Sequence, residues 1–221
     1  MKTSPISSYS QINFTSTIKW TNGYGFQKEL EKLSSKLLVD EPFTRKEIVR
    51  AKEVYTKDAR ICTTGGIVVK NKKGEHEIVM FHLDPEDIKN LNHKRIIRTI
   101  LKKIGKDKPI NAFLFGGKMM NAFSVKLFDC LESFIQKLGI PCTEFKGTPW
   151  DNSGFDLAFN GAENELTARL TTVNFLDKDF FEKRLVPKVE KIVISPTDKV
   201  ILDPLALLQE HWDTGKLNIA V

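Results

Sequence analysis

The stretch ICTTGGIVVKNKKGEHEIVMFHLD, residues 61–84, contains the pattern that decides the fold. Two runs rich in β-branched residues, 67–69 and 78–83, flank the polar sequence Asn-Lys-Lys-Gly, an arrangement typical of a β-hairpin. Cys62 then stands at the start of one strand and His82 at the end of the next. If the two strands pair through the turn, the thiol and the imidazole come to lie near each other.

A cysteine beside a histidine is a candidate nucleophile. A free thiol is only slightly ionised at neutral pH, and a neighbouring imidazole favours the thiolate that attacks an electrophilic carbon. We therefore interpret Cys62 and His82 as a candidate catalytic pair. The plainer interpretation is that Cys62 is inert and buried and that His82 is an ordinary residue at a strand end.

The composition is that of a globular protein of ordinary hydrophobicity. The 221 residues are 41% hydrophobic and 28% charged, and no apolar run is long enough to span a bilayer. The sequence also lacks the pattern of a cleaved signal peptide at its start. The three cysteines do not suggest a disulfide scaffold, so we expect folding in a reducing compartment, with Cys130 and Cys142 packed in the core.

The net charge of +6 is concentrated in the segment 93–108, which predicts a basic helix. Such a surface could attract a polyanion, but no aromatic residues alternate with these cations, which argues against a nucleic-acid partner. The plain interpretation is a solvated helix face. No two of the four histidines share a metal-ligand spacing with cysteines or acids, so we expect neither a metal site nor a cofactor.

The N-terminal region divides into a leader and a pair of helices. Residues 1–26 contain no Asp or Glu and nine Ser or Thr, which predicts a flexible leader. Residues 27–39 place leucines on one helical face, and Thr44-Arg45-Lys46-Glu47 has the form of a capping box that opens a second helix reaching about Tyr55. We therefore expect N-terminal helices over 27–55.

The remaining chain predicts a single α+β domain, residues 27–221, with a mixed β-sheet core flanked by helices. Nothing between residues 56 and 203 has the composition of a domain linker. Besides the hairpin, the patterns predict strands at 110–115, 140–146, 154–160, 165–171, 189–194 and 199–202, and helices at 94–104, 122–138, 177–185 and from Pro204.

The order of these motifs between residues 54 and 171 resembles the bacterial protein-glutamine deamidases of the CheD and cytotoxic necrotizing factor type. In that family a Cys precedes a β-branched strand and a His ends the next one, as Cys62 and His82 do. The likeness continues in a strand that ends in Gly116-Gly117, an amphipathic helix that closes on Leu138-Gly139-Ile140, and a strand-turn-strand around Gly161.

The resemblance implies a layered αββ fold and a thiol site. It implies that Cys62 attacks a carboxamide and that His82 moves protons, while Thr56, six residues before the Cys, orients the imidazole. Backbone N–H groups near Gly65-Gly66 would stabilise the oxyanion. The strand-to-helix turn at Gly116-Gly117 with Asn121, and the aromatic-tipped loop that begins at Trp150, are the other candidate substrate contacts.

The function that follows from the resemblance is deamidation of a glutamine in a protein substrate. Relatives of the CheD type act on chemotaxis receptors and the toxins act on Rho-type GTPases, so the expected partner is receptor-like or GTPase-like. The acid-poor leader favours a bacterial effector or toxin exported without a cleaved signal over a cytoplasmic enzyme. The alternatives are a transglutaminase or other thiol hydrolase, or a non-catalytic module that binds protein or nucleic acid through its basic helix.

Overall fold

The computed structural model describes residues 16–21, 23–35, 37–39, 47–86, 93–117, 121–146, 153–172 and 190–194. The described strands form two mixed sheets. The six-stranded sheet has the spatial order β11 (Glu190–Ile194), β1 (Ser16–Trp20), β10 (Glu165–Thr172), β9 (Ser153–Asn160), β4 (Glu53–Ala59), β2 (Leu38–Val39). The five-stranded sheet has the order β3 (Ile48–Ala51), β6 (His76–Leu83), β5 (Thr63–Lys70), β7 (Lys108–Gly116), β8 (Cys142–Lys146).

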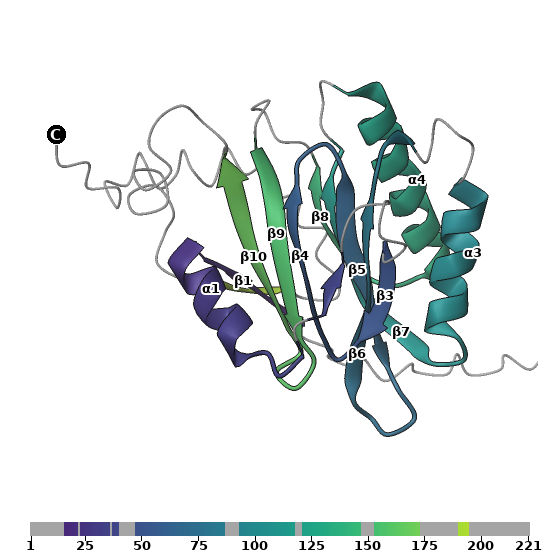
Figure 1. Ribbon diagram of the computed structural model, residues 1–221. Coiled ribbons are helices and arrows are strands. Elements are labelled where there is room, and N and C mark those ends of the chain that lie inside the picture. The colour runs from purple at the N-terminus through teal and green to yellow at the C-terminus, as the bar shows by residue number, and fades with distance from the viewer. Residues whose placement is uncertain are drawn as a thin grey trace, which may run out of the picture.

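The two sheets pack face to face with helices on both outer sides (Figure 1). Helix α1 (Gly23–Lys32) covers the outside of the six-stranded sheet, where Phe26 and Leu30 pack on Ala158. Helices α3 (His93–Ile104) and α4 (Ala122–Leu138) cover the outside of the five-stranded sheet. The predicted α+β class with mixed sheets and flanking helices is confirmed. The layers follow the order α/β/β/α, so the structure has one helical layer more than the αββ fold that the resemblance implies.

The space between the sheets is filled by an apolar core rich in phenylalanine. Phe115 of β7 stacks on Phe145 of β8 at 4.5 Å between ring centroids and meets the edge of Phe155, from β9 of the opposite sheet, at 5.3 Å. Removing such side chains from water is the main favourable term in folding. The other members of this core are Ile18, Val39, Val54, Val68, Ile78, Met80, Ile110, Phe113, Leu157, Phe159, Leu166 and Ala168.

The predicted hairpin is confirmed as β5 and β6. The strands pair antiparallel from Lys70 opposite His76 to Thr63 opposite Leu83, which puts Thr64 opposite His82. In the turn, the Asn71 side-chain oxygen accepts hydrogen bonds from the backbone N–H groups of Lys73 and Glu75. These bonds satisfy turn donors that would otherwise need water, as Asn does in many turns.

The predicted helix over 122–138 is α4. Its buried face contains Phe128, Leu131 and Ile135, which follow the spacing of one helical stripe. The Asn121 side chain accepts from the first N–H groups of the helix, and Gly139 closes its C-terminus with the left-handed conformation that glycine adopts at no steric cost. The basic helix and the strands predicted at 110–115, 140–146, 154–160, 165–171 and 189–194 are also present.

Two predictions for the N-terminal region are wrong. Residues 16–20 of the expected flexible leader form β1, which pairs with β10 and β11 and buries Ile18. The helix expected as far as Tyr55 is replaced by β3 and β4. Buried Val54 and Thr56 alternate with half-buried Tyr55, a period of two that outweighs the capping signal before it. The elements predicted at 177–185, at 199–202 and from Pro204 lie outside the described residues.

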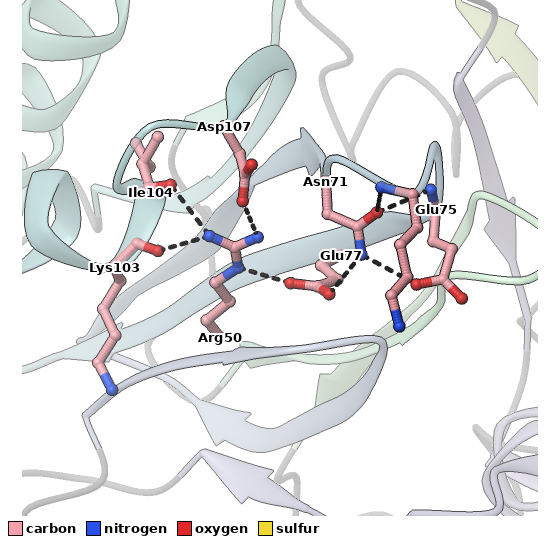
Figure 2. Close-up of polar contacts among 8 residues, drawn as sticks. Arg50, Asn71, Glu75, Glu77, Lys103, Ile104 and Asp107 are labelled. Atoms are coloured by element: carbon pink, nitrogen blue, oxygen red, sulfur yellow. Dashed lines mark hydrogen bonds and ion pairs between the residues drawn. The ribbon is translucent and has the colours of Figure 1, made fainter.

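Arg50 on β3 ties the edge of the five-stranded sheet to the end of α3 (Figure 2). Its Nε donates to Glu77 of β6 at 2.6 Å, one terminal nitrogen donates to the backbone carbonyls of Lys103 and Ile104 at 3.0 Å, and the other pairs with Asp107. The planar guanidinium can bind all these groups together because its five N–H donors have a fixed geometry. Arg50 thus satisfies C-terminal carbonyls of the helix.

Replacing Arg50 should therefore destabilise the fold. We expect Arg50→Met to lower the free energy of unfolding by about 2–3 kcal/mol, because two acids and two helix carbonyls lose their shared partner. Urea unfolding followed by circular dichroism measures this loss. Lys52→Met, which removes an exposed ion pair with Glu75, is the matched control and should leave the value nearly unchanged, because solvent screens exposed ion pairs. Equal effects of both variants would contradict this role for Arg50.

Candidate functional site

The chain changes from one sheet to the other immediately before Cys62. The pairing of β4 with β9 shifts register between Thr56 and Ala59, and within this bulge Asp58 adopts a φ of 59°. The backbone N–H of Asp58 donates to the buried Asp156 carboxylate of β9 at 2.7 Å. Such bulges bend a strand and redirect the residues that follow. Here the chain crosses over residues 60–62 into β5.

Thr56 and His82 meet across the interface between the sheets. On β4, Val54 belongs to the core between the sheets. Thr56 follows two residues later, so its side chain lies on the same face of the strand. On β6, Met80 belongs to the same core, and His82, two residues later, lies on the same face of the strand. The Thr56 Oγ1 lies 2.7 Å from Nδ1 of His82, so a hydrogen bond joins residues 26 positions apart in the sequence and in different sheets.

Cys62 lies at the same end of this sandwich. It stands two residues before Thr64, the cross-strand partner of His82, and is 1% exposed, as His82 is. Diagonal neighbours in an antiparallel pair lie roughly 7–8 Å apart, so Cys62 and His82 belong to the same end of the hairpin. The structure therefore gathers the three predicted catalytic residues, Thr56, Cys62 and His82, at one buried end of the two sheets.

The backbone on either side of Cys62 is held by α4 and β7. The Ser124 hydroxyl, in the first turn of α4, donates to the carbonyl oxygen of Ile61 at 2.7 Å. Gly116 ends β7 with a φ of 131°, and a Cβ there would lie 2.7 Å from the Cys62 carbonyl oxygen. A side chain at position 116 would thus displace the Cys62 peptide. The strand-to-helix turn at Gly116 therefore contacts the backbone of Cys62.

The hydrogen bond to Thr56 defines which nitrogen of His82 can exchange a proton. Because Nδ1 is engaged with Thr56, a proton transfer by this imidazole would use Nε2, which is buried with the rest of the side chain. A histidine held through one ring nitrogen keeps its ring orientation and its tautomer, as in catalytic triads. Burial also excludes bulk water, which strengthens electrostatic interactions between an imidazole and a nearby thiolate. This arrangement is suited to acid–base assistance of a nucleophile.

The other predicted contacts lie in structural positions. Gly65 and Gly66 are buried in β5, where an added Cβ would meet Phe113 backbone oxygen at 2.1 Å and the Ile78 side chain at 2.6 Å. Close packing of the central strand therefore accounts for both glycines. Gly117 packs against Phe128, and Asn121 is the N-cap of α4, so its side-chain oxygen is used within the helix. Trp150 lies outside the described residues.

One residue that shapes the site was not predicted from the sequence. Asp156, which holds the bulge, was missed although it is an acid inside the apolar run Phe155 to Phe159, which is a detectable signal.

No family model, curated protein or solved structure matches this chain. Within the described ranges, no three His, Cys, Asp or Glu residues are grouped as metal ligands would be. In the same part of the chain, no helix is both long enough and apolar enough to cross a bilayer.

Removing the Thr56 hydroxyl should weaken both the fold and the thiol site. Thr56→Val keeps the shape but leaves Nδ1 of His82 buried without this bond, at a cost of about 1–3 kcal/mol in unfolding free energy. We expect a parallel loss of Cys62 alkylation at neutral pH, measured by mass spectrometry. Thr56→Ser keeps the hydroxyl and should retain most of the rate. A valine variant that alkylates as fast as the serine variant would show that this bond does not orient the imidazole.

Asp156 should make stability depend on pH. Burial raises the pKa of its carboxyl, an effect partly offset by the Asp58 N–H and Arg169. The folded protein then binds the proton more tightly than the unfolded chain, so this contribution to stability is greatest below pH 3.8 and is lost as pH rises through the raised pKa. Asp156→Asn should remove that slope in urea unfolding from pH 3.5 upward. Asp129→Asn, at an exposed position, should retain it.

Proposed function

We propose that this protein hydrolyses the side-chain carboxamide of a glutamine in a protein substrate, with Cys62 as nucleophile and His82 as acid and base. The observation that carries the proposal is the hydrogen bond between Thr56 Oγ1 and Nδ1 of His82 at 2.7 Å, in which the imidazolium form donates from Nδ1 to the hydroxyl oxygen. The resemblance to CheD and cytotoxic necrotizing factor proteins implied this third residue from its position alone. The buried contact between two sheets supports the same assignment.

The reaction proceeds in two balanced halves. The Cys62 thiolate adds to the carboxamide carbon, and the tetrahedral intermediate expels the amide nitrogen, which takes a proton from Nε2 of the imidazolium and leaves as ammonia. This leaves a thioester on Cys62 and a neutral imidazole. The imidazole then removes a proton from water, whose oxygen attacks the thioester carbon. The carbon–sulfur bond breaks, releasing glutamate and restoring the thiolate.

Thr56 has an orienting role in this scheme. By holding Nδ1, its hydroxyl directs Nε2 toward the reacting atoms and stabilises the imidazolium that alternates with the neutral ring. The backbone contacts of Ser124 and Gly116 fix the peptide that bears the nucleophile. A nucleophile held in place lowers the entropic cost of reaching the transition state. Helices α3 and α4 with the two sheets form an αββ arrangement, which is compatible with the fold that the resemblance implies.

A binding module is the second candidate, and the outer face of α3 favours it. Lys94, Arg95, Arg98, Lys102 and Lys103 are exposed on a helix that contains no acid. In an enzyme, the same face would steer an acidic receptor-like or GTPase-like substrate and raise the association rate. In a module without catalysis, binding through this face would be the protein's function, and Cys62 would be a packing residue.

The two candidates differ in the chemistry of the Cys62 thiol. For a deamidase we expect alkylation by iodoacetamide to persist well below pH 8 and to shift to higher pH in His82→Ala. Peptide mass spectrometry resolves each cysteine, so Cys130, whose pKa is raised by burial, is a control within the same molecule. Because Cys62 is buried, the pH profile is compared and not the absolute rate.

An ordinary thiol titration of Cys62, unchanged by His82→Ala, would contradict the enzyme. Charge reversal at Lys94, Arg95 and Arg98 would then be the test of the binding module. If Cys62 is activated, incubation of wild-type and Cys62→Ala proteins with a mixture of host-cell proteins separates the possible reactions. A deamidase converts Gln to Glu with chains intact, a transglutaminase attaches an amine, and a protease cuts the chain.

A further inference from the structure

The net charge of the chain is concentrated in one segment, residues 93–108. This segment contains seven of the 34 lysines and arginines and one of the 28 acids, so the remaining 27 cationic and 27 acidic side chains cancel. The one acid, Asp107, is paired with Arg50. The protein therefore has a single strongly basic region on an otherwise balanced molecule.

Helix α3 carries most of this charge on its outer face. The helix lies outside the five-stranded sheet (Figure 1), and its apolar stripe of Ile96, Ile100 and Ile104 is buried in the core beneath it. Arg98 and Lys102 each stand two residues from a buried isoleucine, which on a helix is nearly the opposite direction. The exposed cations that form the basic face of α3 are Lys94, Arg95, Arg98 and Lys102. Within the described ranges, none of these four side chains pairs with an acid.

One apolar side chain is exposed at the border of the basic face. Leu101 is 43% exposed and follows Arg98 by three residues and Lys94 by seven, so it lies on the same side of the helix. A single exposed leucine is ordinary on a protein surface. Its place among the cations nevertheless restricts which anionic partner gains from the whole surface.

The composition of the surface favours a lipid partner over a nucleic acid or a protein. Single-stranded nucleic acids stack on aromatic side chains, and residues 93–108 contain none. Duplex phosphates would attract the cations but gain nothing from Leu101. The centres of protein interfaces are rich in aromatic residues and poor in lysine, whereas Arg98 and Lys102 occupy the centre of this face. A plane of anionic headgroups requires only a convex basic surface, and an apolar side chain can enter its acyl boundary.

We propose that α3 docks the protein on the surface of a bilayer that contains anionic phospholipids. The basic face of α3 lies on the headgroups, and Leu101 inserts at the acyl boundary. The helix can lie flat on this surface without leaving the fold, because its isoleucine stripe stays in the core. This inference is independent of the thiol chemistry and goes beyond the proposed function.

Sedimentation of the full chain with lipid vesicles tests the docking. We expect binding to phosphatidylcholine vesicles that contain about 30% phosphatidylserine, and none to phosphatidylcholine alone. Raising the salt from about 0.1 M to about 0.5 M should release the protein, because the attraction is screened. The combined substitution Lys94→Gln, Arg95→Gln and Arg98→Gln should weaken binding about a hundredfold, since each cation contributes separately.

The matched control removes the same charge from another exposed site. Lys70→Gln, Lys72→Gln and Lys73→Gln lie at the turn of the β5–β6 hairpin and should leave vesicle binding within about threefold of the wild type. Circular dichroism verifies that each variant is folded. An equal loss in the two triple variants would overturn the proposal, because binding would then depend on net charge and not on α3.

Leu101 distinguishes a lipid surface from other polyanions. Leu101→Ser should weaken vesicle binding about threefold to tenfold, because an inserted side chain loses its apolar contact. Phe123→Ser is the control: Phe123 is equally exposed, at 43%, but belongs to α4, and its loss should have no effect.

Three further results would overturn the proposal. They are the absence of binding to the phosphatidylserine vesicles, wild-type binding by Leu101→Ser, and tighter binding to duplex DNA or polyglutamate at the same salt. The last two would indicate a partner recognised by charge alone. Labelling of Cys62 in solution tests the proposed function separately, so failure of either idea leaves the other standing.

Discussion

The face-to-face packing of the two sheets is the constraint on which the rest of this structure depends. The strands of each sheet must present an apolar face to the other, and the phenylalanines of β7, β8 and β9 fill the space between them. The polar pair Thr56 and His82 lies on these same inward faces, at one end. A polar pair can occupy such a place only if each member satisfies the other, since burial without a partner is costly. The packing of the sheets therefore both brings Thr56 and His82 together and shields the pair from solvent.

The thiol lies where the chain passes from one sheet to the other, and several unrelated elements fix that crossing. Asp156 of β9 binds the bulge of β4, Ser124 of α4 binds the carbonyl of Ile61, and the turn at Gly116 leaves no room for a side chain beside Cys62. Each contact comes from a different part of the sequence. A crossing needed only to connect two strands would not require three separate restraints. They act on Asp58, Ile61 and Cys62 in turn, so the crossing is held along its whole length up to the thiol.

Local patterns of the sequence predicted the local structure well. The hairpin followed from two β-branched runs around a turn signal, and α4 followed from its apolar stripe and Gly139. The errors arose where a local signal competed with long-range pairing. A capping box favoured a helix before Tyr55, but β4 gains its hydrogen bonds from β9, about 100 residues later in the chain. Likewise β1 is a strand because β10 and β11 lie beside it, which no pattern within residues 16–20 reveals.

The candidate site shows the same division between local and long-range information. The sequence brought Cys62 and His82 together through one hairpin, but Thr56 was assigned by resemblance, because its contact depends on how two sheets pack. A polar residue on the inward face of a strand is informative only once its partner from the opposite sheet is known, and for Thr56 that partner is Nδ1 of His82.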